Sequence, residues 1–191
     1  MLKVLVIDES RERAADISVG LLKAGYQVAA VLPNALDLKR HVETIRPDVI
    51  LIDSDSPSRD TLEHLSVLSR DNPRPVLLFS REKDSGTIRR ALQAGVAAYV
   101  VESVDSARLD SIVEVALAQF EEVQTLRRER DDASRKLAER VTIERAKGIL
   151  MKTKGLDESE AYHALRRIAM ERNRKIVEMA QAVIDSASLL L

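Results

Sequence analysis

The segment DVILIDSDSP, residues 48–57, sets the first constraint on the fold. Four apolar residues run without interruption over 49–52 and end at Asp53. An unbroken apolar run of this length is typical of a strand that is covered on both faces, as in a parallel sheet. Similar Val-, Ile- and Leu-rich runs occur at 2–7, 27–32, 75–79 and 97–101.

Helical patterns separate these runs. Leu62, Leu65 and Leu68 repeat at helical spacing, and similar repeats predict helices over 11–24, 35–45, 59–70 and 85–94. Alternating strands and helices predict an α/β domain with a doubly wound, five-stranded parallel sheet and right-handed crossovers. The ligand site of such a sheet is expected beyond the carboxyl ends of its strands.

The amino-acid composition excludes several classes of functional site. The chain has 191 residues, 30 basic and 31 acidic side chains, no cysteine and three histidines. The lack of cysteine excludes a disulfide framework, a thiol nucleophile and a cysteine-based zinc site. No apolar run approaches the length of a membrane span, so we expect a soluble cytoplasmic protein without a membrane partner. The segment 127–175 holds 15 basic and 9 acidic residues, a modest excess that suits either phosphate binding or a solvated helix face.

Acidic residues follow two of the predicted strands. Asp8 and Glu9 end the first strand, Asp53 ends the third, and Ser80 ends the fourth. Three carboxylates at matching strand ends suit Mg²⁺, which prefers oxygen ligands, and a carboxylate such as Asp53 can attack a phosphoryl group. A single acidic residue at such a position is more often a helix cap or a solvated loop residue.

Residues 1–120 resemble a response-regulator receiver domain of the flavodoxin-like fold. The resemblance rests on VLVIDES at 4–10, VILIDSDSP at 49–57, LLFS at 77–80 and ALQAGVAAYVVES at 91–103. It implies that Asp53 is the phosphoacceptor, that Asp8, Glu9 and Asp53 hold Mg²⁺, and that Ser80 and Tyr99 are switch residues.

One residue departs from the receiver pattern. Receivers carry a lysine followed by proline just after the fifth strand, where this chain has Glu102 and Ser103. A carboxylate in place of the lysine, a few ångströms from the acyl phosphate, costs on the order of 1–4 kcal/mol. We therefore interpret the domain as a degenerate receiver used for docking and dimerisation. A working phosphorylation switch, with Glu102 at its switch position, is the alternative.

From about 106 to 154 the chain lacks proline and predicts one long helix. The polar segment 121–136 is expected to be a helical coiled-coil linker, or else a passive spacer. The approximate heptad that supports pairing consists of Leu109, Ile112, Ala116, Val123, Leu126, Ala133 and Leu137.

Residues 137–191 resemble an ANTAR domain, the RNA-binding output module of AmiR/NasR-type antiterminators. The resemblance rests on AKGILM at 146–151, DESEAYHALRRIAM at 157–170 and NRKIVEMAQAVI at 173–184. Three helices are expected, with Gly155 ending the first and a capping box at Asp157 starting the second. Asn173 is expected to cap the third. The side chains of Met151, Tyr162 and Met170 are expected in the core, with base stacking as the alternative for Tyr162.

The family implies binding to paired stem-loops in leader RNA, which prevents terminator formation. Basic residues on a helical surface suit RNA loops and phosphates. The predicted RNA-binding residues are Lys147, Arg166, Arg167, Arg140 and Lys175. A DNA-binding role is disfavoured because the basic excess is small. No catalytic site is recognised, so we do not expect an enzyme.

The whole chain is similar to NasT-type regulators of nitrate and nitrite assimilation. RPDVILID at 46–53 and ERAKGILM at 144–151 are among the segments that carry this likeness. It implies control by a NasS-like nitrate-sensor protein. Two alternatives stay open: a phosphorylation-switched regulator with the same RNA output, and a protein-interaction adaptor that binds no RNA.

Overall fold

The computed structural model describes residues 1–101 and 108–188. The chain divides into two compact units, Met1–Gln124 and Thr125–Leu191. The described elements are β1 (Lys3–Asp8), α1 (Arg11–Lys23), β2 (Gln27–Leu32), α2 (Leu38–Ile45), β3 (Val49–Asp53), α3 (Arg59–Asp71), β4 (Val76–Phe79), α4 (Ser85–Gln93), β5 (Ala98–Val100), α5 (Leu109–Lys154), α6 (Glu158–Glu171) and α7 (Ile176–Ser188).

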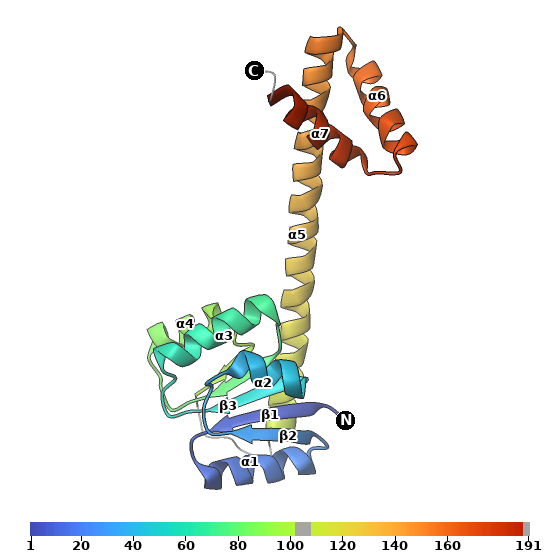
Figure 1. Ribbon diagram of the computed structural model, residues 1–191. Coiled ribbons are helices and arrows are strands. Elements are labelled where there is room, and N and C mark those ends of the chain that lie inside the picture. Colours follow the sequence, from blue (N-terminus) through green and yellow to red (C-terminus); the bar gives the residue numbers. More distant parts are fainter. Residues whose placement is uncertain (102–107, 189–191) are drawn as a thin grey trace. The chain divides into compact units, whose positions relative to one another are not determined.

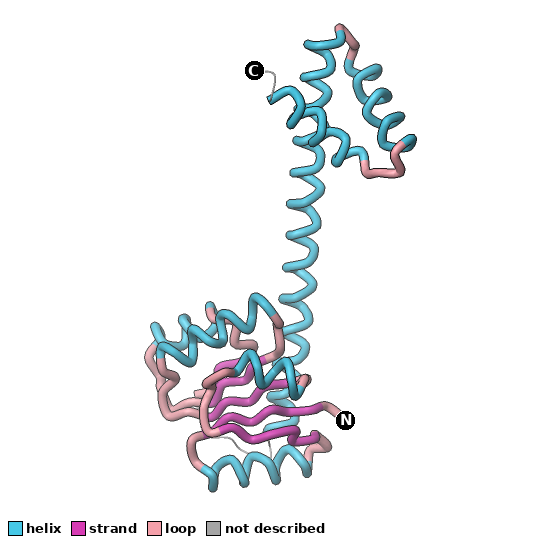
Figure 2. Tube along the Cα trace, in the orientation of Figure 1, coloured by secondary structure: helices cyan, strands magenta, loops and turns pink. Residues whose placement is uncertain are grey.

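The first unit contains the predicted sheet (Figures 1 and 2). Its five strands lie in the order β2-β1-β3-β4-β5, and every neighbouring pair is parallel. The α/β fold class predicted from the sequence is therefore confirmed. The register places Asp8 at the end of β1 directly opposite Asp53 at the end of β3, which brings the two acidic strand ends together.

Each face of the sheet has its own core. Leu5, Ile50 and Leu78 face the side covered by α2, α3 and α4. Their neighbours Val4 and Leu51 point to the opposite side, which α1 and the start of α5 cover. Because successive residues of a strand point to opposite faces, an uninterrupted apolar run is what a doubly covered strand requires.

The start of α5 is packed into the second core. Leu109, Val113 and Ala116 are fully buried there. Next to them, the Tyr26 hydroxyl donates a hydrogen bond to Asp110 Oδ1 at 2.7 Å. Burial, followed by this hydrogen bond, raises the pKa of Tyr26 to about 12. The first turns of α5 are therefore an integral part of the first unit.

One helix of the first unit begins later than the sequence predicts. The expected helix at 35–45 starts only at Leu38, because Asp37 has a left-handed backbone conformation with φ of 52°. The Asn34 side chain instead accepts a hydrogen bond from the Leu36 amide at 3.0 Å and forms a turn.

The second unit has a small core of its own. Ala146 of α5, Leu165 of α6, and Ala180 and Ile184 of α7 form it. Gly155 follows α5 with φ of 67°, as expected for a helix stop. The capping box of Asp157 and Glu160 at the start of α6 is present as predicted.

Four predictions for this unit were wrong. Asn173 does not cap α7: it takes the left-handed position after α6, with φ of 49°, and donates its amide to the Met170 carbonyl. Three side chains expected in the core are exposed, because the core needs only one narrow face of each short helix. They are Met170 at 72%, Tyr162 at 41% and Met151 at 39%.

Among the residues described, no helix has the length and apolarity needed to cross a membrane.

Replacing Tyr26 with phenylalanine tests the anchoring of α5. The change removes one hydrogen bond to Asp110 while the ring stays in place. We expect the free energy of unfolding of the first unit to fall by on the order of 1 kcal/mol in urea denaturation. An unchanged midpoint would show that the apolar contacts alone hold the start of α5.

Candidate functional site

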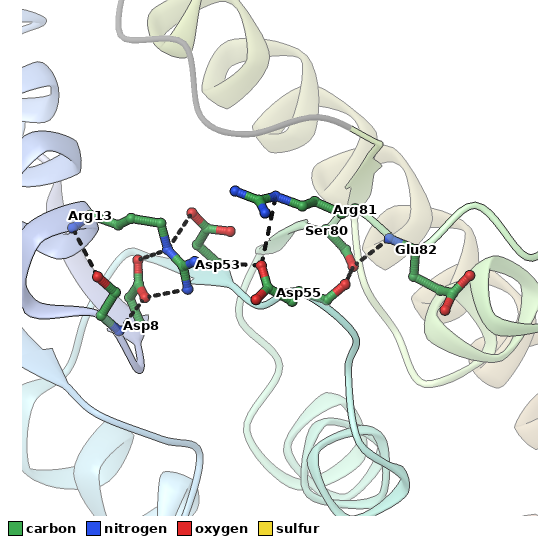
Figure 3. Close-up of polar contacts among 8 residues, drawn as sticks. Asp8, Arg13, Asp53, Asp55, Ser80, Arg81 and Glu82 are labelled. Carbon is green, nitrogen blue, oxygen red and sulfur yellow. Dashed lines mark hydrogen bonds and ion pairs between the residues drawn. The ribbon is translucent and has the colours of Figure 1, made fainter.

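Two buried carboxylates form the centre of a cluster of polar side chains at the carboxyl ends of the strands, which we call the receiver pocket (Figure 3). The exposed fraction is only 3% for Asp8 and 8% for Asp53. Ser80, which follows β4, is also buried. The register of the sheet thus assembles three of the predicted site residues, each from a different strand end.

The Arg13 side chain reaches from α1 into this pocket. Its Nη2 lies 3.0 Å from Asp8 Oδ1, and its Nε lies 3.4 Å from Asp8 Oδ2 and 3.8 Å from Asp53 Oδ2. Its Nη1 lies 3.4 Å from Asp55 Oδ1. The hydrogen bond to Asp8 is the main reason why the pKa of Arg13 is raised. One guanidinium group therefore contacts all three aspartates of the pocket.

The switch residues Ser80 and Tyr99 bond to the loops after β3 and β4 rather than to Asp53. Ser80 Oγ donates to the backbone carbonyl of Asp55 at 3.0 Å and accepts from the Glu82 amide at 3.1 Å. The Tyr99 hydroxyl donates to the Glu82 carbonyl at 3.1 Å. Arg81 adds a longer ion pair to Asp55 at 3.7 Å. Glu102, the third predicted switch residue, lies outside the described residues.

The pKa of Asp53 is raised from its ordinary value. Burial is the main cause, because a carboxylate loses hydration inside the protein. The negative charge of Asp8 raises this pKa further, and the positive charge of Arg13 opposes the effect. Asp53 is thus an ionisable group in a partly dry, carboxylate-rich setting, which is typical of functional sites.

The predicted magnesium ligands do not fit a metal ion in this arrangement. Asp8 and Asp53 are close together, but Glu9 is exposed. Asp8 Oδ1 already accepts hydrogen bonds from the Ser10 amide and from Arg13. Within residues 1–101 and 108–188, no group of three or more Asp, Glu or His side chains is arranged to hold a metal. The Arg13 guanidinium faces both oxygens of Asp8.

Lys147, the first-ranked candidate for RNA contact, is not on the free surface. It is 7% exposed, and its Nζ lies 2.8 Å from both Glu144 Oε2 and Glu158 Oε1. These two carboxylates raise the pKa of Lys147. Because Glu158 opens α6, Lys147 joins α5 to α6, and its burial and two ion pairs make it a positioning residue rather than an RNA contact.

The other four predicted RNA-binding residues lie on the surface. Arg166, Arg167, Arg140 and Lys175 are exposed, and none of them has an ion pair with another described residue. Arg166 and Arg167 line a shallow hollow on α6 together with His163, Met170 and Glu171. Unpaired arginines beside an exposed methionine form a surface that can hold both phosphate and apolar groups.

The sequence profile of the response regulator receiver domain matches residues 4–114. The chain belongs to the response regulator receiver family. Receiver domains of this family typically bind Mg²⁺ for phosphorylation. The profile of the ANTAR domain matches residues 131–184, so the second unit is an ANTAR region. A receiver followed by ANTAR is the architecture of regulatory proteins of transcription rather than of enzymes.

Several known regulatory proteins are similar to this chain. The transcriptional regulatory protein PdtaR of Mycobacterium tuberculosis is 26% identical over 184 residues, covering 96% of this chain and 90% of that protein. The aliphatic amidase regulator of Pseudomonas aeruginosa is 23% identical and covers 97% and 92% of the two chains. The nitrate regulatory protein of Klebsiella oxytoca is 36% identical, but over only 83 residues, or 43% of this chain and 21% of that protein.

Solved structures agree on the receiver fold. The receiver domain of a modulated diguanylate cyclase from Desulfovibrio desulfuricans aligns with a TM-score of 0.55 at 24% identity. The alignment covers 63% of this chain and 97% of that one. At this identity the likeness shows the fold alone.

The sequence analysis did not identify three residues of the receiver pocket: Arg13, Asp55 and Arg81. The contact of Arg13 with Asp8 could have been predicted from its position in the sequence. A helical side chain leans toward the amino end of its helix, and Arg13 lies in the first turn of α1, just after an acidic strand end. A basic residue at that spacing is placed to reach back to Asp8.

Replacing Asp53 with asparagine tests the electrostatics of the pocket. Because the pKa of Asp53 is raised on folding, its ionised form opposes folding above that pKa. We expect Asp53→Asn to raise the free energy of unfolding at pH 7. The gain should shrink as the pH falls through the raised pKa, and vanish below the ordinary aspartate range.

Urea denaturation at several pH values measures this effect, with Asp16→Asn on the exposed side of α1 as the control. Destabilisation by Asp53→Asn at pH 7 would contradict the prediction. It would show that attraction to Arg13 outweighs the cost of burial.

Proposed function

We propose that this protein is a transcription antiterminator that binds paired stem-loops of leader RNA through its ANTAR region. The observation that carries the proposal is the set of exposed cations without ion pairs on α5, α6 and the turn before α7. RNA loops are recognised through splayed bases and phosphates, which suit arginine and lysine on a helical surface. Arg166 and Arg167 form the centre of the proposed interface.

Gly148 supports an extension of this interface along α5. Glycine inside a helix costs roughly 1 kcal/mol relative to alanine. A Cβ atom built at Gly148 would meet nothing within 4 Å, so packing within the chain does not explain the glycine. Arg145 and Lys152, at helical spacing on either side, are exposed and have no ion pair among the described residues. We infer that the RNA backbone approaches α5 closely at Gly148.

Pairing of two copies through α5 is a further part of the proposal. The middle of α5 carries exposed apolar side chains at Leu126, Leu137 and Val141, which are 57%, 65% and 59% exposed. Leu126 and Leu137, together with Val123 and Ala133, continue an approximate heptad stripe, which is the pattern that favours a coiled coil. Val141 lies next to this stripe. A homodimer would present two ANTAR regions to two stem-loops.

We propose that a partner protein, rather than phosphorylation, gates the RNA output. A NasS-like nitrate sensor would sequester the protein until nitrate or nitrite releases it. Glu102 in the sequence, and the satisfied hydrogen bonds of Ser80 away from Asp53, support gating without a phosphoryl group. The local similarity to a nitrate regulatory protein supports nitrate as the signal.

Charge reversal at Arg166 and Arg167 tests RNA binding. The full chain is titrated with a labelled RNA of two short stem-loops, without a phosphodonor, at several salt concentrations. We expect saturable binding that weakens with salt, and a loss of about tenfold or more in affinity for Arg166→Glu, as is typical of one lost contact. Arg135→Glu is the matched control, since Arg135 is already paired with Asp132 and lies outside the heptad stripe of α5.

The outcomes separate the alternatives. Equal loss in the Arg135→Glu control would show that the effect comes from net charge rather than from a specific contact. Binding that appears only with a small phosphodonor and disappears in Asp53→Ala would favour the phosphorylation switch. Absence of binding under every condition would favour the protein-interaction adaptor. Addition of a NasS-like sensor should abolish binding, and nitrate should restore it.

The variant Gly148→Ala distinguishes an effect on RNA contact at Gly148 from an effect on the stability of the fold. Alanine favours the helix and fits the open space, so we expect thermal stability to stay the same or rise. The same variant should bind the two-stem-loop RNA more weakly, because the added methyl group holds the backbone of the RNA away. Ser134→Ala on the same helix is the control, and unchanged RNA affinity in Gly148→Ala would contradict the proposed contact.

A further inference from the structure

The receiver pocket holds a cation of its own. Asp8 and Asp53 are buried side by side at paired strand ends, and buried carboxylates need a cation or hydrogen-bond donors to stay ionised. The groups that supply positive charge are Arg13, which contacts Asp8, Asp53 and Asp55, and Arg81, which contacts Asp55 alone. Arg13 is thus the one described cation that reaches the two buried carboxylates.

We propose that Arg13 is the resident cation of this pocket and that it excludes Mg²⁺ from it. Mg²⁺ needs near-octahedral oxygen ligands at about 2.0–2.1 Å. Both Asp8 oxygens already face the guanidinium, and Asp8 Oδ1 also accepts the Ser10 amide. A divalent cation at this place would have to displace Arg13, because two cations on one carboxylate pair repel each other.

Arg13 has room to move. Its side chain is 32% exposed, whereas the side chain of Asp8 is fully buried. The proposal comprises a closed state, with Arg13 on Asp8, and an open state with the guanidinium in solvent. The affinity for Mg²⁺ is reduced by the fraction of molecules in the open state. The exclusion is a competition that a substitution can remove, rather than a missing ligand.

Magnesium titration of the full chain tests this inference, with Mg²⁺ alone as the probe. Isothermal titration and the shift in melting temperature are recorded for the wild type, Arg13→Gln, Arg13→Lys and Arg81→Gln. We expect no saturable Mg²⁺ binding by the wild type at millimolar concentrations. Arg13→Gln should melt at a lower temperature without metal, and should bind Mg²⁺ about tenfold more tightly or better.

Two control variants show whether the effect on Mg²⁺ binding depends on a positive charge at position 13. Arg81→Gln removes a guanidinium from the rim and should behave like the wild type. Arg13→Lys keeps a positive charge and should bind Mg²⁺ less tightly than Arg13→Gln.

Equal Mg²⁺ affinity in the wild type and Arg13→Gln would overturn the inference, as would an equal gain in Arg81→Gln. If Arg13→Gln does not fold, the inference is tested on the wild type alone, by adding Mn²⁺ and recording NMR spectra. Saturable binding of Mn²⁺ that broadens the NMR signals around Asp53 would then overturn the inference, and unaffected signals would support it.

Discussion

The pairing of β1 with β3 forces two carboxylates together. Asp8 and Asp53 occupy the same register position at the ends of two parallel strands, with their backbones fixed by the sheet and their side chains buried. Neither can move away without breaking the strand pairing. The pocket must therefore include a cation or lose the charge on one carboxyl group. The chain supplies Arg13 from α1, and the geometry of the remaining pocket follows from that contact.

A pocket satisfied in this way has consequences for regulation. The Ser80 hydroxyl bonds to the loop at Asp55 rather than to Asp53, and Tyr99 bonds to the carbonyl of Glu82. Both switch residues thus bond to backbone carbonyls of the loops after β3 and β4. α5 begins in the core of the receiver and continues to Lys154 in the ANTAR region, so one element belongs to both units.

The sequence predicts the strands, the order of elements and the Asp157 capping box because each depends on local pattern. It does not predict the roles of Arg13 and Lys147, since both depend on contacts between elements. Lys147 reads as a surface cation in the sequence, yet a glutamate eleven residues later folds back against it. Met170 and Tyr162 read as core residues, but three short helices bury only a narrow stripe each. Asn173 suits a cap by type, while the turn after α6 needed a left-handed residue instead.

The state of the Arg13 side chain in solution tests the central claim most directly. The Nε–H signal of Arg13 can be assigned by NMR and its exchange with water measured, first with EDTA and then with excess Mg²⁺. We expect a slowly exchanging signal with the same chemical shift in both conditions, because the guanidinium stays on Asp8. A rapidly exchanging signal, or one that moves toward the values of a free arginine when Mg²⁺ is added, would contradict it.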